Sequence, residues 1–313
     1  LGVNPHIMGK LNLGIDFSGG RNYIIRFAEP VNTQEVNAAL DNVFMEAKSE
    51  LADEETFALN VITIGDANQV RVSTNYRIND NSETLDDEIE ALLYEGCKQF
   101  LPENVTLKEF TSTDINPEIG IMQSQKVGPA IADDITQSAV WAVLAALLGI
   151  FLYVLLRFRN FSFSVGALAG LAHNTLIVLG AYALLWKVMP FSMEIDQSFI
   201  AAILTVIGYS INDTVVIFDR VREYTGLYPK RARKQNINDA LNQTLSRTFS
   251  TSMSTLVVLI AIFCFGGETI RGFVFALIIG VVVGTYSSLC VATPLAYDIQ
   301  EALDRRKAKK ASK

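Results

Sequence analysis

An acidic residue stands near the middle of an apolar stretch, and it is the side chain in this sequence best suited to chemistry. Asp213 lies within residues 199–218. A charged carboxylate at the centre of a membrane span costs about 2.5–3.5 kcal/mol on insertion scales, so such a residue is functional by default. We expect Asp213 to take up and release protons. An acid that only hydrogen-bonds to a neighbouring helix is the alternative.

The residues around Asp213 strengthen this expectation because they can form hydrogen bonds. Tyr209 and Ser210 precede Asp213 by four and three positions, which places them on the same helix face. Asn212 and Thr214 flank it directly. We predict a supporting polar face made of Tyr209, Ser210, Asn212 and Thr214.

Two further ionisable residues lie in or beside apolar stretches. Arg247 precedes the next stretch along the chain and could serve as the proton-coupling partner of Asp213. It could equally extend its charge to the membrane surface, as arginines at helix ends often do. His173, followed by Asn174, is a candidate relay because imidazole titrates at about pH 6.5. A lone buried histidine more often makes an ordinary polar contact.

These residues belong to five apolar stretches, at about 139–156, 165–185, 199–218, 252–265 and 272–296. About 20 helical residues cross a hydrocarbon core of ~30 Å. The fourth stretch reaches that length only if the Ser/Thr-rich residues 246–255 are also embedded, facing protein rather than lipid. The pairs Gly166/Gly170 and Gly280/Gly284 predict close helix packing.

The charge distribution divides the chain near residue 138. Half of the 313 residues are hydrophobic, too many for an ordinary soluble domain. Residues 1–138 carry a net charge of −14 and the remainder carry +7. We expect an extracytoplasmic entry segment at 1–20, a soluble α+β domain at 21–115, a linker at 116–138, a transmembrane domain at 139–298 and a basic tail at 299–313.

The soluble part alternates predicted strands and helices. Strands are expected at 22–27, 57–64, 69–74 and 105–110, and helices at 32–49 and 80–100. Asn32 followed by Glu35 resembles a capping box. The order βαββαβ predicts a ferredoxin-like α+β domain. Gly19-Gly20 predicts a turn.

Basic residues gather in alternate loops of the membrane part. They follow the first, third and fifth stretches: Arg157, Arg159, Arg220, Arg222, Lys230, Arg231, Arg233, Lys234, Arg305, Arg306, Lys307, Lys309, Lys310 and Lys313. The other two loops carry only Lys187 and Arg271, beside acidic residues. The positive-inside rule predicts a cytoplasmic C-terminus and an external N-terminal domain, periplasmic in a cell with two membranes.

Other chemistries find little support. Cys97, Cys264 and Cys290 form no CxxC pair, so we expect no disulfide, no metal and no cofactor. An intramembrane aspartyl protease needs two carboxylates that share a proton, and the predicted spans contain only Asp213. A purely structural assembly protein remains an alternative, and in it Asp213 would be replaceable. We expect a transport component rather than an enzyme, with no nucleic-acid partner.

Longer motifs resemble a known family. Residues 206–223, VIGYSINDTVVIFDRVRE, are similar to the signature of SecF, a subunit of the bacterial SecD/SecF protein-export complex. Residues 13–20, LGIDFSGG, resemble the sequence that follows the first SecF span. Val127-Gly-Pro129 and Ser246-Arg-Thr248 also match. The similarity covers nearly the whole chain.

The resemblance implies an RND-type membrane bundle and a proton-driven role in late steps of preprotein export across the inner membrane. It implies SecD, the SecYEG channel and the emerging preprotein as partners, in contact with membrane lipid. The family's intramembrane acid maps onto Asp213 and its basic partner onto Arg247, while Arg220 is expected to anchor its helix at the cytoplasmic face. An RND-type exporter of small molecules or lipids is the alternative, but one external domain argues against it.

The sequence departs from the family pattern in two places. The family often has His-Asp where this chain has His173-Asn174, which weakens a proton role for that site. SecF has a span before the glycine motif, whereas only residues 1–12 precede it here. We therefore expect a chain that lacks its first span, or the C-terminal piece of a fused SecD–SecF polypeptide.

Overall fold

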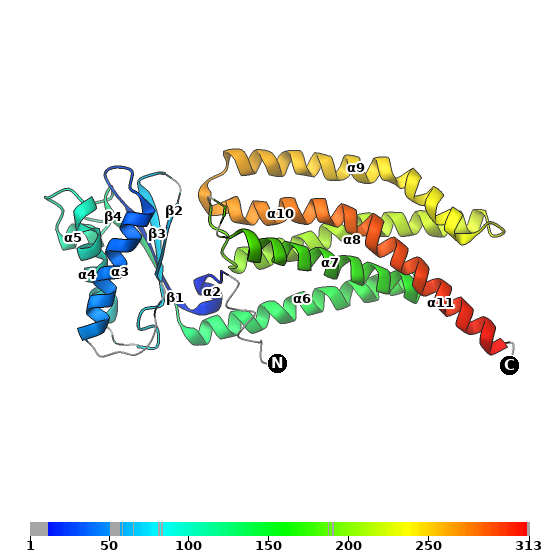
Figure 1. Cartoon of the computed structure of the whole chain (residues 1–313), viewed down its shortest axis with the longest axis horizontal. Coiled ribbons are helices and arrows are strands. Elements are labelled where there is room, and N and C mark those ends of the chain that lie inside the picture. The colour runs from blue at the N-terminus through cyan, green and yellow to red at the C-terminus, as the bar shows by residue number, and fades with distance from the viewer. Residues whose placement is uncertain are drawn as a thin grey trace. The chain divides into compact units, whose positions relative to one another are not determined.

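The computed structural model describes residues 12–311, apart from 51–56, 58, 65, 81, 83, 187 and 190. The chain forms two compact units (Figure 1). The first holds residues 1–138 with the short segments 188–196 and 267–270, and the second holds the rest. Most of the entry segment expected at 1–20 therefore lies outside the described residues.

The first unit, called the soluble unit below, is built on a four-stranded sheet. Its elements are α2 (Ile15–Ser18), β1 (Gly20–Arg26), α3 (Thr33–Glu50), β2 (Leu59–Thr63), β3 (Gln69–Thr74), α4 (Leu85–Cys97), η1 (Lys98–Phe100), α5 (Leu107–Thr111) and β4 (Gly120–Val127). The strand order is β2-β3-β1-β4, and each pair is antiparallel. The predicted ferredoxin-like α+β topology is confirmed, with β4 as its last strand in place of residues 105–110.

Helices α3 and α4 cover one face of this sheet (Figure 1). Alternate strand residues point into the core they enclose, among them Tyr23, Ile25, Val70 and Val72. The predicted cap of α3 is present, because Asn32 Oδ1 accepts a hydrogen bond from the Gln34 amide at 2.9 Å. Burial of these alternating side chains holds the sheet to its helices.

Two predictions for this unit are wrong. The strand expected at 105–110 is instead helix α5, which a capping box between Thr106 and Glu109 begins. The linker expected at 116–138 contains strand β4, paired with β1 from Gly20↔Val127 to Arg26↔Gly120. Because β4 is an edge strand with exposed polar residues in its middle, its sequence looks like a loop.

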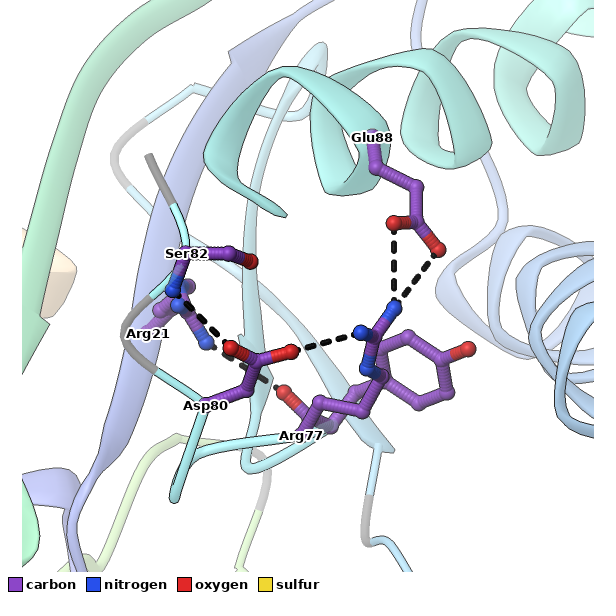
Figure 2. A network of polar contacts seen from close by, with 6 residues as sticks. Arg21, Arg77, Asp80, Ser82 and Glu88 are labelled. Carbon is purple, nitrogen blue, oxygen red and sulfur yellow. Dashed lines mark hydrogen bonds and ion pairs between the residues drawn. The ribbon is translucent and has the colours of Figure 1, made fainter. Parts of the chain in front are cut away.

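The loop between β3 and α4 is held by arginines (Figure 2). Figure 2 shows Arg77 between Glu88 and Asp80. Arg77 Nη1 lies 3.0 Å from Glu88 Oε2, and Arg77 Nη2 lies 2.5 Å from Asp80 Oδ2. Asp80 also accepts a hydrogen bond from the Ser82 amide. Arg21 is almost fully buried; its Nε lies 2.8 Å from Asp86, and its Nη1 donates to the Tyr76 carbonyl. These contacts satisfy charges that burial would otherwise make costly.

The second unit, called the membrane unit below, is helical. Helices α6 (Pro129–Phe158), α7 (Phe161–Leu185), α8 (Gln197–Leu227), α9 (Arg233–Phe265) and α10 (Glu268–Ser287) follow one another. The first turns of α6, up to residue 138, and of α10, up to residue 270, belong to the soluble unit. A π-helical turn, η2 (Ser288–Ala292), joins α10 to α11 (Thr293–Ala311). Within the described residues, five helical segments are long and apolar enough to cross a membrane, the last running through residues 270–310. The five predicted spans are confirmed, and the expected tail at 299–313 continues the helix to residue 311.

Packing explains two details of the spans. Helix α9 includes the Ser/Thr-rich residues 246–255, and Thr248 and Ser252 within it are buried against protein, as expected. Gly166 on α7 lies so close to α11 that an added Cβ would be 2.8 Å from the Ala296 Cβ. The small residues thus permit the close helix packing that the sequence predicts.

Candidate functional site

Asp213 lies on α8 with only 4% of its surface exposed, among the helices of the membrane unit. Within the part of the chain that the structure describes, its Oδ2 atom has no hydrogen-bond partner. A carboxylate oxygen that is buried and unpartnered is costly when charged. The arrangement suits a group that gains a proton, or one that meets a cation in another arrangement of the helices.

Helix α7 reaches the site through Asn174. Its side-chain nitrogen donates to Ser210 Oγ at 2.7 Å and to the Gly280 carbonyl at 3.2 Å, which links α7, α8 and α10. Two glycines of α10 make this approach possible. A Cβ at Gly280 would lie 2.2 Å from a Val206 methyl, and one at Gly284 would lie 2.2 Å from Ser210 Oγ. The Gly280/Gly284 pair therefore brings α10 directly against the polar face of α8.

The π-helical turn supplies a second set of contacts. Ser288 Oγ lies 2.9 Å from Thr214 Oγ1 and 3.3 Å from the Ser210 carbonyl, just beside Asp213 on α8. Thr293 Oγ1 donates a hydrogen bond to the Ser288 carbonyl, so this carbonyl keeps a hydrogen-bond partner within the wider π-helical turn. Single π-helical turns inside helices occur frequently at functional sites. Here the turn places a hydroxyl against the residue that follows Asp213.

Helix α9 provides the charged neighbour. On α9, the charge of Arg247 acts on the Asp213 carboxyl, and Ser252 forms a side-chain hydrogen bond with it. Among the described residues no ion pair joins Arg247 to Asp213, and the Arg247 side chain is exposed in the isolated chain. Ser252 Oγ lies 2.6 Å from Thr285 Oγ1 on α10, and Tyr209 donates to Thr255 Oγ1 at 3.2 Å.

The structure brings most of the predicted site residues together. Tyr209, Ser210 and Thr214 make polar contacts with three different helices around Asp213. Asn212 does not join them, because it is exposed on another side of α8. Consecutive helical residues point about 100° apart, so a residue next to Asp213 in the sequence need not share its helix face.

His173 forms a separate contact. Its Nδ1 lies 2.8 Å from Ser287 Oγ, while its neighbour Asn174 faces Ser210. The relay role proposed for His173 therefore has a polar contact but no direct contact with Asp213 in this arrangement. Asn174, Ser252, Thr285 and Ser288 were not expected at the site. The Ser/Thr-rich run before the fourth span and the Gly280/Gly284 pair are the signals that could have indicated them.

No group of three metal-ligating side chains occurs in the described part of the chain. The site is therefore a cluster of one carboxyl, several hydroxyls, one amide and one nearby guanidinium. A carboxyl surrounded by hydroxyls is chemically able to hold and pass a proton.

Comparison with known proteins identifies the family. The model for the C-terminal region of the protein-export membrane proteins SecD/SecF matches residues 107–302, and the model for the SecD/SecF GG motif matches residues 9–31. The chain belongs to the SecD/SecF family of protein-export membrane proteins. The first match includes the whole polar cluster described above.

Individual relatives agree. The chain is 40% identical to the protein translocase subunit SecF of Rhodothermus marinus over 291 residues, which cover 93% of this chain and 84% of that protein. It is 36% identical to SecF of Thermodesulfovibrio yellowstonii, over 92% of this chain and 83% of the relative. The crystal structure of SecDF from Thermus thermophilus, a translocon-associated membrane protein, superposes with a TM-score of 0.71 at 30% identity. That match covers 94% of this chain but 35% of SecDF.

Proposed function

We propose that this chain is the SecF-type part of an auxiliary complex of the Sec translocase, which uses the proton gradient to promote late steps of preprotein export. Its family membership and its likeness to named translocase subunits support the place in the Sec pathway. One observation carries the use of protons: Asp213 is buried in the membrane unit with an unpartnered oxygen, inside a cluster of hydroxyls.

The position of Arg247 supports a cycle rather than a fixed ion pair. A carboxylate held permanently against a guanidinium would stay charged and would carry no proton. Here the arginine is near enough to influence Asp213, but the two form no ion pair among the described contacts. A pair that forms in one state and breaks in another links proton binding to a change of helix arrangement. We propose that Asp213 binds a proton when the pair is broken and releases it when the pair forms.

A SecD-type partner is supported by polar residues that the chain leaves uncovered. Asn212 on α8 and Arg247 on α9 are exposed within spans that would otherwise face lipid. Polar side chains at such depth usually face protein or water. The chain spans about a third of the length of Thermus thermophilus SecDF, so a larger partner region exists in that protein. We propose that a SecD half, on a separate or the same polypeptide, covers Asn212 and Arg247.

The proposed orientation follows from the loops. The basic residues gather at the C-terminal ends of α6, α8 and α11, at the start of α9, and in the α6–α7 and α8–α9 connections. The positive-inside rule places this side of the membrane unit in the cytoplasm. The soluble unit and the connections α7–α8 and α9–α10 then lie outside, in the periplasm of a cell with two membranes. This orientation presents the soluble unit to a preprotein that emerges from SecYEG.

The test is export driven by the proton gradient in inner-membrane vesicles that contain the SecD partner and SecYEG. Asp213→Asn keeps the size and hydrogen bonding of the side chain but binds no proton, so it should insert normally and fail to support export. Asp213→Glu keeps the acid and should retain part of the activity. Full export with Asp213→Asn, at equal expression, would show that Asp213 is only a packing residue.

A further inference from the structure

The connection between α7 and α8 contributes a buried segment to the soluble unit. Residues 188–196 belong to that unit, and within them Met193 and Ile195 are almost fully buried, with 1% and 5% of their surfaces exposed. A connection that only joined two spans would expose such side chains to water. Burial of two large apolar residues two positions apart is instead typical of a short docked strand.

Backbone hydrogen bonds fix this segment beside the glycine motif. The Ile195 amide donates to the Asn12 carbonyl at 2.8 Å, and the Gly14 amide donates to the Ile195 carbonyl at 2.9 Å. Leu13 and Ile195 form a parallel bridge. A Cβ at Gly14 would lie 3.4 Å from the Ile195 carbonyl oxygen and the Asp196 Cβ, so residue 14 is in van der Waals contact with the segment.

Gly19 and Gly20 shape the chain segment that residues 193–195 contact. Gly19 and Gly20 have φ values of +71° and +152°, which ordinary residues rarely adopt. A Cβ at Gly20 would lie 2.8 Å from Ile15 Cγ2, so the turn also requires glycine for space. By reversing the chain between α2 and β1, the pair holds residues 13–15 where Ile195 can bind.

An ion pair fixes the register of the segment. Glu194 Oε2 lies 3.1 Å from Arg71 Nη1 on β3, and the two side chains are 9% and 16% exposed. Glu194 also lines a cavity of about 270 Å³, together with Asn60 and Ser73 of the sheet. A shift of the segment by one residue would remove Glu194 from Arg71 and turn Met193 and Ile195 away from their buried sites.

We propose that residues 193–195 are a docking segment that holds the α7–α8 connection within the soluble unit, so that docking and the state of Asp213 influence each other along the continuous helix α8. Helix α8 begins at Gln197, directly after the segment, and runs without interruption through Asp213. A helix is stiff over this distance, about 24 Å at 1.5 Å per residue. The coupling part of this inference rests on the proposed function, whereas the docking itself does not.

Hydrogen exchange of the full chain in bicelles tests the docking. Ile195→Pro removes the amide that donates to Asn12, so residues 12–14 and 193–196 should exchange at least tenfold faster. Val188→Pro is the matched control, because Val188 lies in the same connection with 74% of its surface exposed. It should leave residues 12–14 unchanged. Equal exchange of residues 12–14 in both variants would overturn the docking.

A reversible cross-link tests the coupling and keeps the proposal falsifiable should Ile195→Pro misfold. Leu13→Cys with Ile195→Cys, in a Cys264→Ala, Cys290→Ala background, joins the bridge partners. Neighbouring strand positions have the Cα spacing that a disulfide needs. If the segment stays docked during transport, the oxidised protein should export preproteins as well as the reduced one, and Ile195→Pro should lose most export.

The outcomes separate the two levels of inference. Loss of export on oxidation would overturn permanent docking, and full export by an undocked Ile195→Pro protein would overturn the coupling. Neither result bears on whether Asp213 carries protons, which Asp213→Asn decides separately. Conversely, full export by Asp213→Asn would remove the proposed function and leave the exchange result intact.

Discussion

Gly280→Ala is the substitution whose effect on stability follows most directly from the packing around Asp213. The added methyl carbon would lie 2.2 and 2.7 Å from the two methyl groups of Val206 and 3.0 Å from its Cβ. Because the Cβ is also too close, no rotation of Val206 relieves the overlap. Helix α10 must move away from α8, and its Gly280 carbonyl, which accepts from Asn174, must move with it.

The magnitude follows from comparison with a glycine that has free space. Overpacking of this kind costs about 1–3 kcal/mol, whereas Gly→Ala within a helix gains up to about 1 kcal/mol from backbone propensity. Gly208 on α8 has no atom within 4 Å of an added Cβ, so Gly208→Ala shows the propensity gain alone. The Gly280→Ala protein should therefore be less stable than the Gly208→Ala protein by about 1–3 kcal/mol.

The assay is the free energy of unfolding in bicelles, measured by titration with a denaturing detergent. Val206→Ala should partly rescue Gly280→Ala, because the two methyl carbons that overlap most are then absent. The double variant should be more stable than the sum of the single effects predicts, by about 0.5–3 kcal/mol. Strict additivity, or equal stabilities for Gly280→Ala and Gly208→Ala, would refute the close contact between α8 and α10.

Three further outcomes are expected. Burial raises the pKa of the Cys97 thiol to about 12, so Cys97 should resist a thiol-reactive probe at pH 8 until the protein is denatured; rapid labelling of the native protein would contradict its burial. Burial also raises the pKa of the Glu194 carboxyl, to which Asp196 and Asp16 add, while Arg71 and a hydrogen bond from Asn60 oppose it. Glu194 then binds a proton more tightly when the segment is docked than when it is undocked. Hydrogen-exchange protection of the Ile195 amide, corrected for the intrinsic rate, should be greatest below the ordinary glutamate pKa of about 4.3 and should decline as pH rises through the raised pKa of Glu194. Glu194→Gln should abolish this pH dependence, and protection that grows with rising pH would contradict it. Finally, an impermeant maleimide should not label Lys230→Cys in intact cells when Cys264 and Cys290 are replaced by alanine, since the α8–α9 connection is proposed to be cytoplasmic.

Sequence patterns predicted most of the elements because their signals are local. Hydropathy located the five spans, and strand β3 was predicted at its observed limits, Gln69–Thr74. The cap at Asn32 located the start of α3 to within a residue. Each of these signals depends on a few neighbouring side chains, which the linear sequence contains in full.

Strand β4 and helix α5 show where local signals were insufficient. The middle of β4 is polar and exposed, and its strand geometry depends on pairing with β1, about a hundred positions earlier in the chain. Conversely, residues 105–110 have strand-like composition, but the reciprocal bonds of Thr106 and Glu109 begin a helix there. The hydrogen-bond partner outweighed intrinsic preference in both cases.

The residue type and position of Asp213 were sufficient to single it out, because an acid in an apolar span has few explanations. Its surroundings were decided by the tertiary structure. Asn174, Ser252 and Ser288 reach the α8 polar face from three other segments. Their separations in the sequence do not predict that they lie together. The docked Ile195 is a similar case, since its hydrogen-bond partners Asn12 and Gly14 lie about 180 positions earlier in the chain. Sequence determines which side chains are costly to leave unpaired in a membrane, but only the packed helices determine which groups lie near enough to satisfy them.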